Sequence, residues 1–276
     1  MARKRGGYNV IDFDGFQNYL YEEELSKNTI DCYMLSLRQF QEHYDEITKA
    51  NMIGFKQMLI AKGFKPGTVN LRITGLLAYC KYKDISMKMK HIKEPKKTHV
   101  ENVITADQVE MLLNCLSADG RESWRVNVLL LAKTGMRISE ALRIKKRDIL
   151  NGSVTLHTKA HMRTIYFPKS LADDIKGYLE KLNDDDTVMR TKFGKPMTSR
   201  GVAEGLKRYG KLYGIPKEVM HPHAFRHFFA IEFLKRNNNI ALLADILGHS
   251  DVKMTQLYLR QSQEQQQDAV NKAVNW

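Results

Sequence analysis

The chain has 276 residues, and its 44 Lys and Arg against 31 Asp and Glu give a formal net charge of +13 at pH 7. This length suits one large or two modest domains, and the basic excess favours a polyanionic partner, nucleic acid or an anionic membrane surface, over an unrelated basic enzyme. A membrane-spanning chain is excluded, because no apolar run approaches the ~18–20 residues that a spanning helix needs, and no apolar stretch follows the basic N-terminus as in a signal peptide.

Residues 10–90 show the apolar spacing of four successive helices. Ser26 is placed to cap the second helix, Gly63 to end the third and Pro66 to open the fourth. The sequence therefore predicts a small all-helical domain, preceded by a basic leader at residues 1–9.

Basic side chains are spread along the outer faces of these helices, and most of them are expected to be solvated surface. Lys27 and Arg72 are candidates for contacts with DNA phosphates. Arg72, in the N-terminal half of the fourth helix, is the better candidate of the two.

A lysine-rich stretch with one proline and two acidic residues follows at residues 88–102. Low apolar content and a run of like charge are typical of a linker, which we place at residues 91–102. A linker this basic can also follow a phosphate backbone. Its candidate DNA contacts are Lys93, Lys96 and Lys97.

Helical spacing resumes in residues 103–260. Thr105 is a natural N-cap near the start of this region. Residues 125–134 form the most apolar helix of the chain, and Gly135 is its expected C-terminal stop. A further helix is expected to open at about Ile138.

Within this region the hydrophobic period changes to two at residues 153–158 and 163–168, with a tight turn between them, which predicts a β-hairpin. Helices resume from Lys169 onward. The expected fold class is therefore mainly α with one small β-hairpin or sheet.

Five basic residues in short, ordered settings accompany Tyr258 near the end of the chain. Attack on a phosphodiester builds negative charge on the non-bridging oxygens, which paired guanidinium groups can clamp at any physiological pH. Two arginines, a lysine and two histidines around a tyrosine are the groups that such chemistry needs. The five basic residues are Arg137, Lys159, His223, Arg226 and His249.

The position of each side chain suggests its role. Arg137 and Arg226 suit the clamp, and Lys159, on a hairpin tip, can protonate the leaving oxygen. Tyr258 is the candidate covalent nucleophile. Glu140 follows Arg137 by one helical turn and can hold the arginine fork or a histidine in place.

His223 and His249 can orient the phosphate or exchange protons near neutral pH. Taken alone, each residue has a plainer explanation: Arg137 as a helix cap, Lys159 as an exposed turn lysine, and His223 and His227 as core histidines. The sequence contains neither an ATP-binding loop nor the carboxylate cluster of a two-metal site, so we expect no metal or other cofactor.

In their joint order, these stretches resemble the catalytic domain of the tyrosine recombinases, also called the phage integrase family. The spacing of nine residues from His249 to Tyr258 is the spacing of that family. The tip Thr158-Lys159-Ala160 departs from the commoner Gly-Lys-Gly, and Phe225 stands where leucine is commoner. The matching stretches are Thr134–Glu140, Thr158–Lys159, His223–His227 and Leu247–Ser250.

The resemblance implies an activating pocket made of the five basic residues, and a 3′-phosphotyrosine link at Tyr258 that frees a 5′-hydroxyl. It implies a catalytic domain at residues 103–260 and a core-DNA-binding domain at residues 10–90. Few residues precede the first helix, so the chain looks like the minimal two-domain form, similar to Xer-type recombinases and small mobile-element integrases. The implied partner is double-stranded DNA with specific sites, bound by a homotetramer that spans two of them.

The tail at residues 261–276 has an apolar helical stripe. It can pack on its own domain, and the resemblance implies instead that it docks into a neighbouring protomer. The odd number of cysteines, with no metal-type pair, indicates small buried thiols in a reducing cytoplasm. The cysteines are Cys32, Cys80 and Cys115.

Two other functions stay open from the sequence. One is a type IB topoisomerase, which uses the same pocket to relax DNA. The other is a sequence-specific DNA-binding protein without catalysis. The sequence leaves undecided the target site, any accessory protein, and the choice between resolving chromosome dimers and moving a mobile element.

Overall fold

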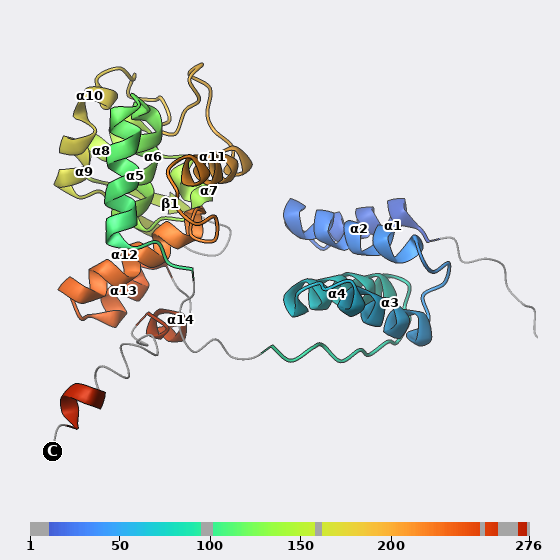
Figure 1. Ribbon diagram of the computed structural model, residues 1–276. Coiled ribbons are helices and arrows are strands. Elements are labelled where there is room, and N and C mark those ends of the chain that lie inside the picture. The colour runs from blue at the N-terminus through green and yellow to red at the C-terminus, as the bar shows by residue number, and fades with distance from the viewer. Residues whose placement is uncertain (1–10, 95–101, 158–161, 249–251, 259–269, 275–276) are drawn as a thin grey trace, which may run out of the picture. The chain divides into compact units, whose positions relative to one another are not determined.

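The computed structural model describes residues 11–94, 102–157, 162–248, 252–258 and 270–274. The chain divides into two compact units, residues 1–96 and 97–276. Each has its own hydrophobic core, and each is described by itself (Figure 1).

Four helices make up the described part of the first unit: α1 (Phe13–Glu22), α2 (Lys27–Gln41), α3 (Lys49–Ala61) and α4 (Pro66–Tyr82). In Figure 1, α1 and α2 lie over α3 and α4. Ser26 caps α2 by accepting a hydrogen bond from the backbone N–H of Thr29, and Pro66 stands in the first turn of α4. Phe16, Phe40 and Phe55 are fully buried between the helices. The predicted four-helix fold of this region is confirmed.

The chain after α4 stays in contact with the first unit. Ile85, Met87, Met89 and Ile92 pack against its core. Asn70 on α4 holds the backbone of Ile92 on both sides, donating to its carbonyl at 3.0 Å and accepting from its N–H at 2.8 Å. The linker predicted at residues 91–102 therefore begins next to α4, where Asn70 holds Ile92, and its bounds stay a prediction.

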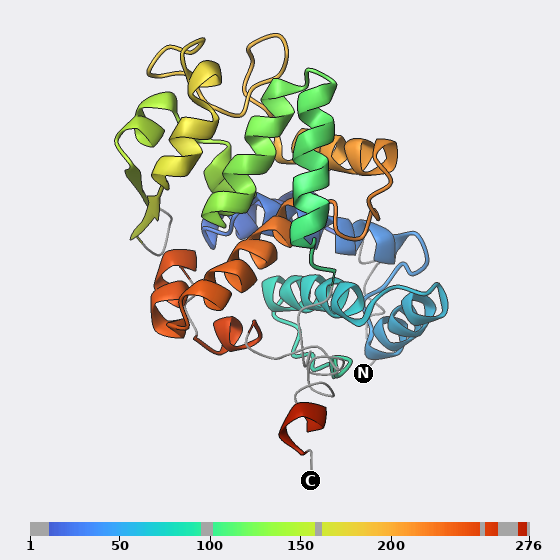
Figure 2. The ribbon, with the colours of Figure 1, turned by 60° about the vertical axis from the view of Figure 1, so that its left-hand side comes forward.

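The second unit has the following described elements: α5 (Ala106–Ala118), α6 (Glu122–Thr134), α7 (Ile138–Ala141), α8 (Lys146–Leu150), β1 (Ser153–His157), β2 (Met162–Tyr166), α9 (Lys169–Asp174), α10 (Lys176–Leu179), α11 (Ser199–Leu212), α12 (Pro222–Arg236), α13 (Ile240–Leu247) and α14 (Val252–Gln256). The helix α6 is buried along most of its length, and α5 and α12 pack against it (Figure 2). Thr105 and Gln108 form a capping box at the start of α5. The strands pair antiparallel in the register Leu156↔Arg163, so the predicted hairpin is confirmed.

Two further sequence predictions concern the whole chain. The cysteines, all in described stretches, form no disulfide; Cys80 is buried, whereas Cys32 and Cys115 are half-buried. Among the described residues, no helix combines the length and the apolar character needed to cross a bilayer.

Gly135 ends α6 in the left-handed region, with φ of 59°, and directs the chain into the loop before α7. A Cβ atom there would lie 2.4 Å from the ring of Phe229 on α12. We therefore expect Gly135→Ala to lower the free energy of unfolding by about 1–2 kcal/mol for the backbone conformation and by about 1–3 kcal/mol more for the displaced ring. Urea unfolding followed by tryptophan fluorescence measures the change in the second unit, which contains both tryptophans, Trp124 and Trp276.

Gly120→Ala is the matched control. Gly120 has nearly the same φ, 62°, and nothing lies within 4 Å of an added Cβ. Gly120→Ala should lower the free energy of unfolding only by the contribution of the backbone conformation. Equal losses in the two variants would contradict a role for Gly135 in the close packing of α6 on α12.

Candidate active site

The turn between α6 and α7 places Arg137 at the N-terminus of α7. Glu140, three residues later, accepts the backbone N–H of Arg137 at 2.7 Å and its Nη1 at 3.3 Å. The second terminal nitrogen of Arg137, Nη2, donates to the carbonyl of Gly248 at 2.9 Å. Glu140 therefore holds the arginine fork, one of the two arrangements that the sequence analysis considered.

Arg163 on β2 is a second cation on the same carboxylate, and the sequence analysis missed it. Its Nη1 donates to Glu140 at 2.6 Å, while Nε and Nη2 donate to the carbonyl of Ile246 at 3.0 and 2.6 Å. Gly248, with φ of 63°, leaves room for it, since a Cβ there would lie 2.6 Å from Cδ of Arg163. Burial lowers the pKa of Arg163, and the charge of Glu140 opposes that shift.

A signal for Arg163 was present in the sequence. The strand alternates, so Arg163 shares its face with the buried Ile165, and the two are 7% and 2% exposed. A charged residue on the inward face of a half-buried strand needs a buried partner. In the structure that partner is the carboxylate of Glu140.

Glu140→Ala is expected to lower the free energy of unfolding of the second unit by about 3–5 kcal/mol, because it leaves a buried arginine without its counter-charge. The side chains of Glu140 and Arg163 are only 5% and 6% exposed. Glu204→Ala is the control, since it breaks an ion pair with Arg200 that is 62% and 88% exposed and should cost less than about 1 kcal/mol. Urea unfolding measures both, and a loss at Glu140 no larger than at Glu204 would contradict the bridging role.

Arg226 lies on α12 and is 2% exposed. Its Nη1 donates to the carbonyl of Gly135 at 2.8 Å and its Nη2 to the carbonyl of Leu247 at 2.7 Å. Burial, followed by the charges of Arg137 and Arg163, lowers the pKa of Arg226 to about 10, which still leaves it protonated near neutral pH. The backbone carbonyls thus fix a permanent positive charge beside that of Arg137, which favours an anion.

His223 and His227 stand one turn apart on α12, with ring centroids 5.0 Å apart in an edge-on arrangement. The side chain of His223 is exposed, yet the surrounding protein lowers its pKa by desolvation, and Arg226 adds to the shift. Nδ1 of His227 lies 2.8 Å from the hydroxyl of Tyr258. Burial raises the pKa of Tyr258, and the charge of Arg226 opposes that rise.

These side chains surround one cavity of about 160 Å³, whose lining also includes the apolar Met254 and Leu257. It brings together four of the six predicted catalytic residues, Arg137, His223, Arg226 and Tyr258, from the N-cap of α7, from α12 and from the segment after α14. The other two, Lys159 and His249, lie outside the described residues. A cavity with two arginines, two histidines and a phenol can take a tetrahedral anion.

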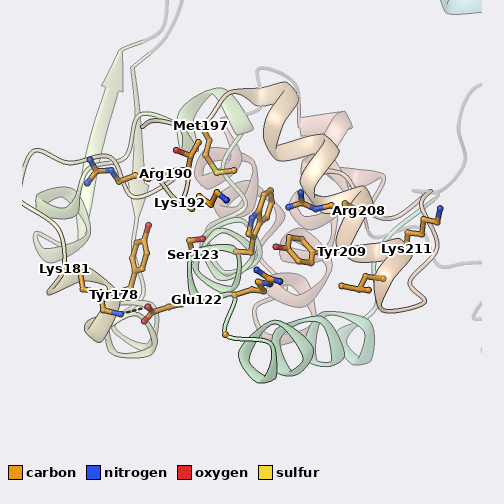
Figure 3. Close-up of a pocket in the computed structure, with 15 residues that line it drawn as sticks. Glu122, Ser123, Tyr178, Lys181, Arg190, Lys192, Met197, Arg208, Tyr209 and Lys211 are labelled. Atoms are coloured by element: carbon orange, nitrogen blue, oxygen red, sulfur yellow. Dashed lines mark hydrogen bonds and ion pairs between the residues drawn. The ribbon is translucent and has the colours of Figure 1, made fainter. Parts of the chain in front are cut away.

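A larger cavity, of about 1100 Å³, lies in the second unit but contains none of the predicted residues (Figure 3). It opens at the N-terminal end of α6, around Trp124, whereas Arg137 follows the C-terminal end of this helix about 20 Å away. Some of its charged groups have partners: Lys181 pairs with Glu122 at 2.5 Å, and the guanidinium of Arg208 lies over the rings of Tyr209 and Trp124. Size alone therefore does not identify the site.

The predicted DNA contacts differ in exposure. Lys27 and Lys93 are exposed. Arg72 is 8% exposed, and its Nε donates to Gln39 at 2.7 Å, so part of its guanidinium is engaged inside the first unit. Lys96 and Lys97 lie outside the described residues, and the five contacts stay predictions.

Known proteins match most of this chain. The model of the phage integrase family matches residues 102–265. The chain belongs to this family. The resemblance inferred from the motifs is confirmed, as is the mainly helical fold with one small sheet.

Relatives of the family match nearly the whole chain. Tyrosine recombinase XerA of Pyrococcus furiosus is 32% identical over 268 residues, which cover 94% of this chain and 92% of the relative. Tyrosine recombinase XerD of Oceanobacillus iheyensis is 27% identical and covers 91% and 93%.

Solved structures of the family share the fold. A lambda integrase dimer bound to a COC′ core site aligns with a TM-score of 0.73 at 18% identity, covering 89% of this chain and 75% of that one. XerH bound to its difH substrate aligns with a TM-score of 0.68 at 17% identity, covering 92% and 84%.

Proposed function

We propose that this chain cuts and rejoins duplex DNA at specific sites through a 3′-phosphotyrosine link formed by Tyr258. As a member of the tyrosine recombinase family, the chain is a site-specific recombinase that breaks and rejoins DNA strands. The observation that supports the residue assignment is the cavity that Tyr258 lines together with Arg137, Arg226 and His223. The two alternatives, a type IB topoisomerase and a non-catalytic DNA-binding protein, are not favoured by this membership.

In the proposed reaction the scissile phosphate occupies this cavity. Arg137 and Arg226 hold the non-bridging oxygens and stabilise the charge that grows on them, and His223 orients the phosphate. The phenol oxygen of Tyr258 attacks phosphorus, the bond from phosphorus to the 5′-oxygen breaks, and the leaving oxygen takes a proton. The proposed donor of that proton is Lys159, as the resemblance implies.

Glu140 and Arg163 position Arg137 for this reaction and do not line the cavity themselves. Glu140 binds the backbone and the side chain of Arg137, and Arg163 ties the same carboxylate to the carbonyl of Ile246. The phosphate-binding arginine is thus fixed before substrate arrives, so little reorganisation is needed during the reaction.

The proposal extends to the rest of the chain. Residues 10–90 bind the core DNA, with the lysine-rich segment at residues 91–102 following the phosphate backbone, and residues 103–260 carry the catalysis. The solved relatives bound to DNA support a duplex partner. Because strand exchange joins two duplexes, each with two cut strands, we propose a homotetramer that spans two sites.

The tail at residues 261–276 is proposed to dock on a neighbouring protomer. Within its described part, Val270 and Val274 are each 53% exposed, which leaves apolar surface to cover. Deleting residues 262–276 should leave the binding of one duplex, measured by gel shift, unchanged. It should lower the yield of the protein assembly that holds two duplexes, measured by native mass spectrometry. An unchanged recombination rate and assembly would contradict the docking.

The test of the proposed function is covalent capture. A pool of nicked duplexes with randomised recognition arms is incubated with the wild-type protein, and DNA that stays bound through denaturation is sequenced. Trypsin cleavage after Lys253 and Arg260 gives a peptide whose single tyrosine is Tyr258. We expect mass spectrometry to find the nucleotide adduct on that peptide. No protease-sensitive adduct with any duplex would overturn the proposal.

A further inference from the structure

His227 has no part in the reaction described so far, although its Nδ1 atom lies 2.8 Å from the hydroxyl of Tyr258. We propose that His227 is the base that takes the proton of Tyr258 when the phenol attacks the phosphate. This inference rests on the proposed function and assigns a group to a step that it leaves open, the activation of the nucleophile.

The helix α12 holds His227 in place. His223, Arg226, His227 and Ala230 are spaced as neighbours on one face of α12, with Arg226 and Ala230 buried. The rings of His227 and Tyr258 are 5.5 Å apart between centroids, and both residues line the same cavity. The contact is therefore built on a packed helix, which is the rigid support that a proton acceptor requires.

Tyr258 needs such a base. A phenol is protonated at neutral pH and is then a weak nucleophile. Burial raises the pKa of Tyr258 further, only partly opposed by Arg226. The site thus protects the hydroxyl from ionising in the resting enzyme, and its proton has to leave during the attack itself.

The other groups around the cavity suit this step less well. Arg137 and Arg226 stay protonated at physiological pH and cannot accept a proton. From the segment at and after α14, the lining residues Met254 and Leu257 do not titrate. Of the two described histidines in the lining, His227 is the one at hydrogen-bonding distance from the phenol, whereas His223 is placed one turn closer to the start of α12.

The proton balance closes over the full reaction. In the Nε2–H tautomer the neutral His227 accepts the phenol proton at Nδ1 as the oxygen–phosphorus bond forms, and the leaving 5′-oxygen is protonated separately. When a 5′-hydroxyl attacks the phosphotyrosine in the rejoining step, its proton returns to Lys159, the proposed donor in cleavage, and the released phenolate takes its proton back from His227. No oxidant, metal or other reactant is consumed.

The test uses the full chain and a suicide duplex that the covalent capture recovers. Asparagine can keep a hydrogen bond near Nδ1 but cannot accept a proton. We therefore expect His227→Asn to bind this duplex like the wild type and to cleave it on the order of 10²-fold more slowly at neutral pH. Its rate should rise steadily with pH, because the phenol proton then has to be taken by solvent. His43→Asn, at an exposed histidine of the first unit, is the control with unchanged cleavage.

A second substrate separates the two proton transfers. With sulfur in place of the bridging 5′-oxygen the leaving group needs no proton, so Lys159→Ala should recover its cleavage rate and His227→Asn should not. Wild-type cleavage in His227→Asn, or its rescue by the sulfur substrate, would overturn the assignment of His227 as the base. Absence of an adduct with the wild-type protein would instead be the failure of the proposed function.

Discussion

We expect Tyr258→Phe to abolish the covalent adduct in the capture assay and to leave duplex binding unchanged. Phenylalanine keeps the ring that packs beside Ala230, Leu234, Leu243 and Leu247, and it removes only the hydroxyl. The loss of the hydrogen bond to Nδ1 of His227 should lower the free energy of unfolding by about 1 kcal/mol. The variant therefore folds and binds, but it lacks the atom that forms the bond to phosphorus.

The matched control is Tyr166→Phe. Tyr166 ends β2 and is 62% exposed, so its hydroxyl is not part of the cavity. It should form the adduct at the wild-type rate. An adduct in Tyr258→Phe, on any residue, would show that the phenol is not the nucleophile.

Arg226→Lys is expected to slow single-turnover cleavage on the order of 10²–10³-fold, the usual loss for one preorganised donor to an oxyanion. The guanidinium of Arg226 donates to the carbonyls of Gly135 and Leu247 while it carries charge into the cavity. Lysine keeps the charge but has no planar fork, so it cannot hold both carbonyls and a phosphate oxygen in the same geometry. Cleavage of the suicide duplex at saturating protein measures the rate of the step.

Arg236→Lys, at the other end of α12, is the control for this substitution. Arg236 pairs with Glu232 and is 77% exposed, so lysine should be tolerated there without loss of rate. Urea unfolding of both variants separates lost catalysis from lost folding. Wild-type cleavage in Arg226→Lys would contradict the clamp.

The local rules of the sequence predicted much of the fold. Ser26 and Thr105 cap helices as predicted, because an N-cap depends on a side chain and a backbone N–H two or three residues away. Gly135 stops α6 for a similarly local reason, its access to positive φ.

The family and the identity of the candidate catalytic residues were also readable from the sequence, because the motifs are contiguous and their spacing is specific. Arg163 and His227 were missed as site residues for different reasons. Arg163 looked like one polar position in a short strand, and its buried partner comes from α7. His227 looked like a core histidine beside a motif, and its partner comes from the far end of the chain.

The sequence by itself therefore determined the helices, the hairpin, the family and the set of chemical groups, since each depends on neighbours within a few residues. Only the tertiary structure decided how these groups meet. Packing of α12 against α6 brings Arg226 to the carbonyl of Gly135, 91 residues away, and the segment after α14 brings Tyr258 to His227. Contacts of this kind depend on which helix faces bury one another, and no local pattern encodes them.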